Sequence, residues 1–406
     1  MIRYRSVIRN PQRFSPVGMY KRRLIVIIVS VFALSGSMTA QTPSPSVSTG
    51  FGVDTTITDV RNIVSLVRAY LAKPDTTARS RGLWTTSTEF DRRVGDATLF
   101  QAYEGFPATV VGVLSTSDES VYVVRVLYAR ADSTGAAAPL ALQRLYAVRD
   151  PSARFGFKLA SALPRVTRYW EQRSAGPITF IYAPGQPPNQ ARIDSVARFV
   201  DSVARIFAVP QPQHLDVIVG QSMDDVLRAI GLDFYPEPSG PGQRSGGRNL
   251  GSILLVGNPQ IGEAYYHEFV HAILGPHIRA GTRLLSEGVA TWLGGSRGRS
   301  AREVYAALLQ YQRADSTLSL SKLYRTGFDD ADPLRQSDLV YGSGALIANA
   351  VYQKRGITGL RDIYQAGGDA ESMLRTISTA LGLPPNDPGA LDRWWRAEAA
   401  RAATLP

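Results

Sequence analysis

The stretch GEAYYHEFVHAIL, Gly262–Leu274, carries two of the four histidines in this chain of 406 residues, His267 and His271. Side chains four positions apart on an α-helix lie on the same face, one turn above the other. The spacing therefore predicts that two imidazole nitrogens reach a single metal ion. Glu268 is offset toward the side where a metal-bound water would lie. The alternative is an amphipathic helix with two polar residues on its exposed face.

The five residues from His267 to His271, HEFVH, fit the H-E-x-x-H pattern, in which two histidines bind zinc and the glutamate is the general base of a metalloprotease. Two histidines do not complete a catalytic zinc site, because such a site takes three protein ligands and leaves the fourth position to water. The chain has no cysteine, which excludes disulfides, thiol catalysis and thiolate ligands. Any further zinc ligand is therefore expected to be a histidine or a carboxylate.

Glu287 is the candidate for the third ligand. It lies in the segment Leu284–Leu293, LLSEGVATWL, which is predicted to form the next helix, sixteen residues after His271. The apolar residues of this segment define a packed side: Leu285, Val289, Trp292 and Leu293. Glu287 falls on or near that side, where an unpaired carboxylate would be costly and a zinc ion would be a suitable partner. Gly288 is expected to let the metal helix approach closely. The alternative for Glu287 is an acid on the helix surface.

HEFVH followed by LLSEGVATWLGG resembles the gluzincin metallopeptidases, and among them the peptidase MA-like group related to aminopeptidase N and thermolysin. The resemblance extends from about Gly176 to Ala399. In that family the two histidines and the glutamate of an E-G-x-A segment bind one zinc ion. The resemblance thus implies one Zn²⁺, a zincin-type domain and a general base at Glu268. The implied zinc ligands are His267, His271 and Glu287.

A third segment, Asp338–Gly356, DLVYGSGALIANAVYQKRG, also resembles the family. In such enzymes a tyrosine at the start of a late helix donates a hydrogen bond to the oxyanion. Tyr341 occupies the comparable place, 54 residues after Glu287. Two alternatives are a packing role for Tyr341 and a donor role for His277, six residues beyond His271.

Two family features are absent from the sequence. The aminopeptidases carry a G-x-M-E-N segment before the metal helix, and its acid binds the amino terminus of the substrate. This chain has Gly247–Gly251, GRNLG, in that place and no acid there, so aminopeptidase action does not follow from the resemblance. Thr291 stands where thermolysin-type enzymes have an aspartate that orients a histidine, so the groups behind the ligands are expected to differ.

These residues predict a zinc-dependent metallopeptidase that acts on a peptide or protein substrate. The metal lowers the pKa of its bound water to about 7. Glu268 takes the proton of that water and passes it to the leaving amine, and Tyr341 stabilises the oxyanion. The strand before the metal helix is expected to offer an exposed edge that pairs with the substrate backbone. The alternative is a catalytically inactive, peptidase-like binding module of the cell envelope.

The formal charge of +11 is concentrated in the first forty residues, which hold seven basic side chains and no acid. Removing these seven from 45 leaves 38 basic against 34 acidic side chains, a charge of +4. A body this mildly basic gives no reason to expect a nucleic-acid partner.

Residues 1–40 are predicted to form a signal peptide. A positive region, Lys21–Arg23, precedes an apolar run from Leu24 to Leu34, and mostly small residues follow as far as Ala40. This run is shorter than the roughly 20 residues that a bilayer span takes, so no stable span is expected after leader removal. The alternative is an uncleaved N-terminal anchor. In either case the protein is expected to be exported, as a periplasmic or secreted protein.

The body of the chain is predicted to be of the α+β class. Residues 41–52, rich in Thr, Ser and Pro, are expected to be a flexible linker. Residues 53–170 are expected to form an accessory domain in which a helix precedes a run of antiparallel strands. The strand segments are Ala108–Leu114, Val121–Ala129, Leu140–Val148 and Phe155–Leu159. Their order resembles the nuclear transport factor 2-like fold. Without histidines or clustered carboxylates, this domain is expected to serve packing.

Residues 176–295 are predicted to form the zincin catalytic domain, and residues 296–406 a mostly α-helical C-terminal lobe. The catalytic domain is expected to alternate strands and helices: Ile178–Tyr182, Ile193–Phe207, His214–Val219, Met223–Ile230 and Leu250–Val256. His214, alone at a strand start, is expected to be structural or exposed. Trp394 and Trp395 are expected to pack the last helix of the lobe.

Overall fold

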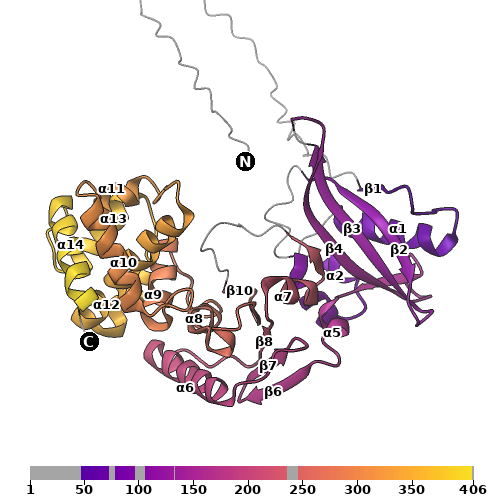
Figure 1. Ribbon diagram of the computed structural model, residues 1–406, viewed down its shortest axis with the longest axis horizontal. Helices are drawn as coiled ribbons and strands as arrows, with labels where there is room; N and C mark the ends of the chain where they lie inside the picture. Colours follow the sequence, from indigo (N-terminus) through magenta and orange to yellow (C-terminus); the bar gives the residue numbers. More distant parts are fainter. Residues whose placement is uncertain (1–46, 73–77, 97–105, 132, 236–245, 405–406) are drawn as a thin grey trace, which may run out of the picture. The chain divides into compact units, whose positions relative to one another are not determined.

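The computed structural model describes residues 47–72, 78–96, 106–131, 133–235 and 246–404 (Figure 1). The predicted signal peptide lies outside the described residues, and so does the first half of the predicted linker. Within them the chain combines two sheets with many helices, which confirms the expected mixture of the two. Among the described residues, no helix has both the length and the apolar character to cross a membrane.

Sheet A is formed by strands of the N-terminal half and one later strand, and it is antiparallel except at one edge. Its strand order is β1-β2-β3-β4-β5, with β9 paired to β4. The strands are β1 (Val47–Thr49), β2 (Ala108–Ser115), β3 (Val121–Ala131), β4 (Ala137–Arg149), β5 (Phe157–Ala160) and β9 (Leu232–Phe234). Val124, Val126 and Tyr128 of β3 are buried on one face, as their alternation predicts. Helix α1 (Thr58–Leu71) packs against this sheet through Ile63 and Val67.

The segment predicted as a flexible linker, residues 41–52, contributes a strand at its end. Val47–Thr49 form β1, which pairs in parallel with Ala108–Val110 of β2. The backbone N–H of Gly50 donates to the Val110 carbonyl over 2.8 Å. The expectation of flexibility is therefore wrong for this part, because main-chain pairing needs no apolar side chains.

Sheet B belongs to the middle of the chain and has the strand order β10-β11-β8-β7-β6. Its strands are β6 (Glu171–Ala175), β7 (Ile178–Tyr182), β8 (Leu215–Val219), β10 (Gly247–Asn249) and β11 (Ile253–Val256). The three inner strands are parallel, and both edge strands run antiparallel to their neighbours. Parallel neighbours need a crossover, and α6 (Gln190–Phe207) supplies it between β7 and β8.

The inner strands of sheet B, β7, β8 and β11, are buried on both faces, which explains why they are mostly apolar. Val217 and Leu254 belong to a core shared with the helices that follow in sequence. Ile218 and Leu255, their neighbours in sequence, belong to a second core shared with sheet A. Because successive side chains point to opposite faces, a strand buried on both sides cannot alternate apolar with polar residues.

The expectation that the strand before the metal helix forms the sheet edge is wrong. That strand, β11, lies between β8 and β10. The edge is β10, a three-residue strand that the sequence analysis did not predict. The domain boundary predicted near Gly176 falls after β6, although β6 is part of sheet B.

The part of the chain from Tyr266 to Thr404 is helical. Its helices are α8 (Tyr266–Leu274), α9 (Arg283–Gly294), α10 (Ala301–Ala314), α11 (Leu320–Arg325), α12 (Pro333–Gln365), α13 (Ala370–Ala380) and α14 (Pro388–Thr404). The helices α9 to α14 gather together in the orange-to-yellow part of Figure 1. Helix α12 is broken at Gly356, where φ is 63°. Trp395 of α14 is fully buried, and its indole N–H donates to the Ser343 hydroxyl over 3.0 Å, so it has the expected packing role.

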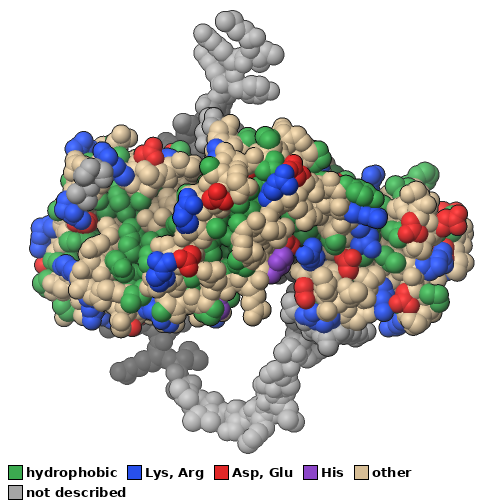
Figure 2. Space-filling view, turned by 90° about the horizontal axis from the view of Figure 1, so that it is seen from below, with side chains coloured by type: hydrophobic (Ala, Val, Ile, Leu, Met, Phe, Trp, Pro, Cys, Tyr) green, Lys and Arg blue, Asp and Glu red, His purple; other side chains and the backbone are tan. Residues whose placement is uncertain are grey.

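The remaining elements are short connectors. They are α2 (Ala78–Arg81), α3 (Ser87–Asp91), α5 (Leu163–Val166), α7 (Met223–Ala229) and the 3₁₀ turn η1 (Gly262–Ala264). On the face drawn in Figure 2, Lys and Arg side chains are interspersed with Asp and Glu side chains. This face therefore has no continuous basic stripe of the kind that follows a nucleic-acid backbone.

Candidate metal centre

Helix α8 presents its two histidines because its other face is apolar. Phe269, Val270 and Ile273 are fully buried and pack on the shared core. The helix follows the η1 turn and ends at Gly275, whose N–H donates to the His271 carbonyl over 2.9 Å, as the Gly-Pro stop predicts. His267 is buried and His271 is half-buried.

Helix α9 brings Glu287 to the same place. The Thr282 hydroxyl accepts a hydrogen bond from the Leu285 N–H over 3.4 Å, which caps the start of the helix. Leu285 and Val289 are fully buried, and Glu287 is thereby turned toward α8.

Gly288 has a different role from the predicted one. A Cβ at this position would lie 2.3 Å from the carbonyl carbon of Gly344, so Gly288 permits the approach of α12. The glycine that the metal helix requires is Gly294, where a Cβ would lie 2.6 Å from the backbone nitrogen of His267. The prediction named the right helix but the wrong glycine.

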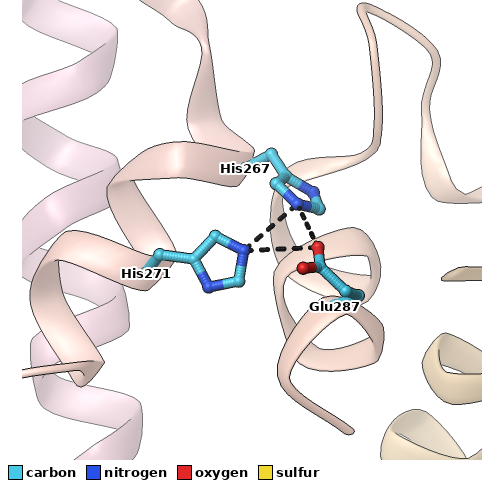
Figure 3. A group of neighbouring side chains, drawn as sticks. All are labelled: His267, His271 and Glu287. Atoms are coloured by element: carbon cyan, nitrogen blue, oxygen red, sulfur yellow. Dashed lines mark hydrogen bonds and ion pairs between the residues drawn. The ribbon is translucent and has the colours of Figure 1, made fainter. Parts of the chain in front are cut away.

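Three ligand atoms converge between these helices (Figure 3). His267 Nε2 lies 3.0 Å from Glu287 Oε2, and His271 Nε2 lies 3.5 Å from the same oxygen. The two Nε2 atoms are 3.2 Å apart. Ligand atoms about 2.1 Å from a tetrahedral zinc ion would be roughly 3.4 Å from one another. The spacing and the two-nitrogen, one-oxygen donor set therefore fit a catalytic zinc ion.

The tautomer of His267 is set by the backbone. Its Nδ1 lies 2.8 Å from the carbonyl oxygen of Gly295. A carbonyl only accepts hydrogen bonds, so Nδ1 carries a proton, which leaves Nε2 as the nitrogen that would bind a metal. Thr291, which stands in place of a second-sphere aspartate, is fully buried and has no partner for its hydroxyl among the described residues. A main-chain carbonyl thus orients the histidine.

The charges of the cluster are complementary even without a cation. Burial, the largest effect, works against ionisation of Glu287, but hydrogen bonds from His267 and His271 hold its pKa well below the ordinary value. Burial also opposes protonation of His271, while the Glu287 carboxylate raises the pKa of that imidazole. The carboxylate is therefore anionic, as a metal ligand has to be.

Glu268 lies beside the three ligand atoms rather than among them. It lines a cavity of about 820 Å³ together with His271 and Glu287. Burial raises the pKa of Glu268, and the two neighbouring imidazoles partly offset that rise. A carboxylate with a raised pKa accepts protons more readily at neutral pH, which suits a general base.

Tyr341 of α12 lines the same cavity. Its ring stacks on that of His267, with centroids 5.5 Å apart and planes inclined by 19°. Burial raises the pKa of Tyr341 to about 12, and Glu287 adds to the rise, so the phenol keeps its proton. His277, the alternative donor, is exposed beyond the end of α8 and is not among the residues that line the cavity. Tyr352 packs on Trp292 instead.

Several residues around the metal centre and the cavity had no role assigned from the sequence. Arg248 and Asn249 of β10 line it, and the Asn249 side-chain amide donates to the Glu268 carbonyl over 3.2 Å. Tyr265 is buried next to His267, with ring centroids 6.4 Å apart. The three-residue strand β10 carries no periodic pattern, so these side chains had no recognisable signal in the sequence. His214 is exposed, and its Nε2 lies 2.8 Å from Asp216 Oδ1. It is not a member of the ligand group.

No protein-family model matches this sequence, and no curated protein matches it. Among solved structures, the chain is similar to a mutant of an M1 zinc metallopeptidase from Deinococcus radiodurans, with 15% identity and a TM-score of 0.33. The mutant bound to a Tyr-ser-ala substrate matches with 16% identity and a TM-score of 0.34. A two-domain M1 zinc metallopeptidase mutant bound to L-arginine matches with 15% identity and a TM-score of 0.31. Each match covers 74% of this chain, which spans 65% of the length of the matched chain.

Proposed function

We propose that this protein is a zinc-dependent metallopeptidase of the gluzincin type, which hydrolyses peptide bonds with Glu268 as the general base. The observation that carries the proposal is the convergence of His267 Nε2, His271 Nε2 and Glu287 Oε2 within 3.0 to 3.5 Å of one another. The ligand atoms come from two consecutive helices and open on a cavity large enough for a peptide segment.

The residues around the cluster divide the chemistry among them. His267, His271 and Glu287 would hold a zinc ion, which would supply a bound water of pKa about 7 and polarise the scissile carbonyl. Glu268 accepts the proton of the attacking water and delivers it to the leaving amine. Tyr341, protonated at neutral pH, donates a hydrogen bond to the developing oxyanion.

The proposed substrate is a peptide in extended conformation. β10 forms the edge of sheet B, and its three residues, Gly247–Asn249, line the cavity. An edge strand offers unpaired main-chain groups to an added strand. We propose further that the protein is exported, on the grounds of the leader-like residues 1–40.

The decisive experiment compares Glu268→Gln with His271→Ala. Glu268→Gln keeps every ligand, so the purified variant retains one zinc per chain while cleavage of a peptide library falls by about 10²–10⁴-fold. His271→Ala loses a ligand and is expected to lose the metal. Metal content is measured by elemental analysis and cleavage by mass spectrometry of the library.

Two outcomes would contradict the proposal. Cleavage by Glu268→Gln at the wild-type rate would show that Glu268 is not the general base. A wild-type protein that binds zinc but cleaves no peptide would instead support the alternative, an inactive binding module.

A further inference from the structure

A second cavity, of about 590 Å³, shares no lining residue with the first. It lies between the end of α9, the start of α10 and the turn that precedes α8. Gly295, whose carbonyl accepts the His267 hydrogen bond, is part of its wall. The proposed peptidase chemistry makes no use of this cavity.

The charged side chains that line this cavity are all basic. Arg192, Arg297 and Arg299 line the cavity, and no acidic residue lines it among those that the structure describes. The positive end of α10 opens on the same space, because Ser300 and Ala301 also line it. The Glu303 carboxylate, bound to the N–H and hydroxyl of Ser300, partly offsets the positive partial charge of this helix end, so the arginines supply most of the positive field. The cavity therefore favours a negatively charged occupant.

Two of the three arginines already have strong partners. Both terminal nitrogens of Arg299 bind the carboxylate of Asp338. Arg192 donates to the carbonyls of Pro259 and Gln260 over 3.3 and 3.1 Å, and its Nη1 lies 3.8 Å from Glu263. These two guanidinium groups contribute to the electrostatic field of the cavity, but their hydrogen bonds are largely taken.

Arg297 differs from its two neighbours. Its Nη2 donates to the Ser337 hydroxyl over 2.9 Å, and no carboxylate pairs with it within the described part of the chain. Its Nη1 is shielded from solvent and has no hydrogen-bond partner there. The backbone at Arg297 has a φ of 53°, a conformation that L-residues rarely adopt. The guanidinium of Arg297, which lines the cavity, thus carries a charge that no described carboxylate neutralises, and an anion in the cavity would supply the counter-charge.

Another part of the wall is apolar. Trp292, Leu293 and Ile261 line it, and both Trp292 and Leu293 are only half-buried. We propose that this cavity binds a small organic anion, with its carboxylate or phosphate group against Arg297 and its apolar part against Trp292 and Leu293. A guanidinium binds both kinds of oxyanion in the same two-pronged way.

Calorimetric titration of the zinc-loaded protein tests the proposal with three probes: phenyl phosphate, benzoate and inorganic phosphate. We expect saturable binding of phenyl phosphate or benzoate at one site, and weaker binding of inorganic phosphate, which lacks the apolar part. Comparison of phenyl phosphate with benzoate identifies the preferred oxyanion. Arg297→Gln is expected to weaken binding by about tenfold or more, because it removes a charge-assisted hydrogen bond.

The control variant is Arg279→Gln, which removes an arginine that lines the first cavity and not the second. It is expected to bind the probes like the wild type. The titrations are repeated after chelation, since a zinc ion can itself bind anions, and binding at the second cavity is expected to persist. If Arg297→Gln does not fold, Arg297→Asn takes its place, because asparagine tolerates a positive φ.

Three results would overturn the proposal: no saturable binding of either aromatic anion, unchanged binding by the Arg297 variant, or loss of binding on chelation. None of these results depends on peptide hydrolysis. Failure of this inference is therefore distinguishable from failure of the proposed function.

Discussion

His267 is held by neighbours that do not touch the metal position. The Gly295 carbonyl accepts its Nδ1–H, and the rings of Tyr265 and Tyr341 stack on it with centroids 6.4 and 5.5 Å away. A ligand that is oriented in advance loses little entropy on binding a metal. Each of these contacts comes from a different segment of the chain, so the spacing of the two histidines alone could not reveal them.

At the scale of single residues, Tyr341→Phe removes the hydroxyl and keeps the ring, so it tests the role of the hydroxyl alone. Phenylalanine keeps the stacking on His267, so metal content and thermal stability are expected to stay at the wild-type level. The peptidase rate is expected to fall by about 10–10³-fold, the cost of losing one oxyanion donor. The rate is measured as kcat on a fluorogenic peptide selected from the library.

Tyr352→Phe is the matched control, because Tyr352 packs on Trp292 and does not line the cavity. Equal kcat values for the wild type and Tyr341→Phe would show that Tyr341 packs and does not donate to the oxyanion.

At the scale of elements, the site depends on how closely α9 approaches both α8 and α12. Gly294 faces the backbone of His267, and Gly288 faces the backbone of Gly344. The sequence predicted α8 from the spacing of its histidines, α9 from its apolar residues and α12 from the family resemblance, but it could not predict which glycine faces which helix. That choice depends on how the helices cross, which neighbours in space determine.

Gly288→Ala is expected to destabilise the protein by about 1–3 kcal/mol, because overpacking forces backbones apart. The new Cβ would lie 2.3 Å from the Gly344 carbonyl carbon, an atom that cannot rotate away. Since Glu287 is the adjacent residue, zinc affinity is expected to fall as well. Urea unfolding measures the first effect and zinc titration the second.

Gly112→Ala in β2 serves as the control for a glycine substitution, because its nearest new contact is at 3.9 Å. A Gly288→Ala protein as stable as Gly112→Ala would mean that α9 and α12 do not pack as closely as described.

A buried polar cluster joins the helices of the first half to sheet A. Asp96 accepts hydrogen bonds from Tyr70 of α1 and Gln143 of β4, and its Oδ2 lies 3.1 Å from Arg93 Nη1. The side chains of Arg93 and Asp96 are 9% and 3% exposed, so this ion pair is desolvated. Removing one partner of such a pair leaves a buried charge without its counterion.

Asp96→Ala is therefore expected to cost about 3–5 kcal/mol in the free energy of unfolding. Asp91→Ala removes the acid of the exposed Arg81–Asp91 pair and is expected to cost at most about 1 kcal/mol. Denaturant unfolding of both variants, in the same buffer, gives the comparison. Similar costs for the two variants would show that the Asp96 cluster adds no stability.

At the scale of the whole molecule, the metal site lies in the core that ties sheet B to the C-terminal helices. Phe269 of α8, Leu285 of α9 and Leu346 of α12 belong to that one core. A metal that bridges α8 and α9 binds the folded state and not the unfolded chain, so its binding adds to the stability of the whole core.

Chelation is therefore expected to lower the melting temperature of the wild type. Free zinc at about 1,000 times its Kd adds roughly 4 kcal/mol of stability, and this contribution is lost when the metal is removed. His271→Ala is the control, since a protein that holds no zinc should melt at the same temperature with and without chelator. Differential scanning calorimetry makes the measurement, and an unchanged wild-type transition would argue against zinc in this site.

The sequence by itself determined that His267 and His271 share one helix face and that Glu287 lies near the packed side of the next helix, because helical periodicity and the four-residue spacing are local properties. It also determined the long strands and the amphipathic helices, whose patterns extend over many residues. Only the tertiary structure decided that β10 is the edge of sheet B, that the Gly295 carbonyl orients His267, and that Arg297 faces a second cavity. These features arise from contacts between distant segments through main-chain atoms or short strands, which leave no periodic trace in the sequence.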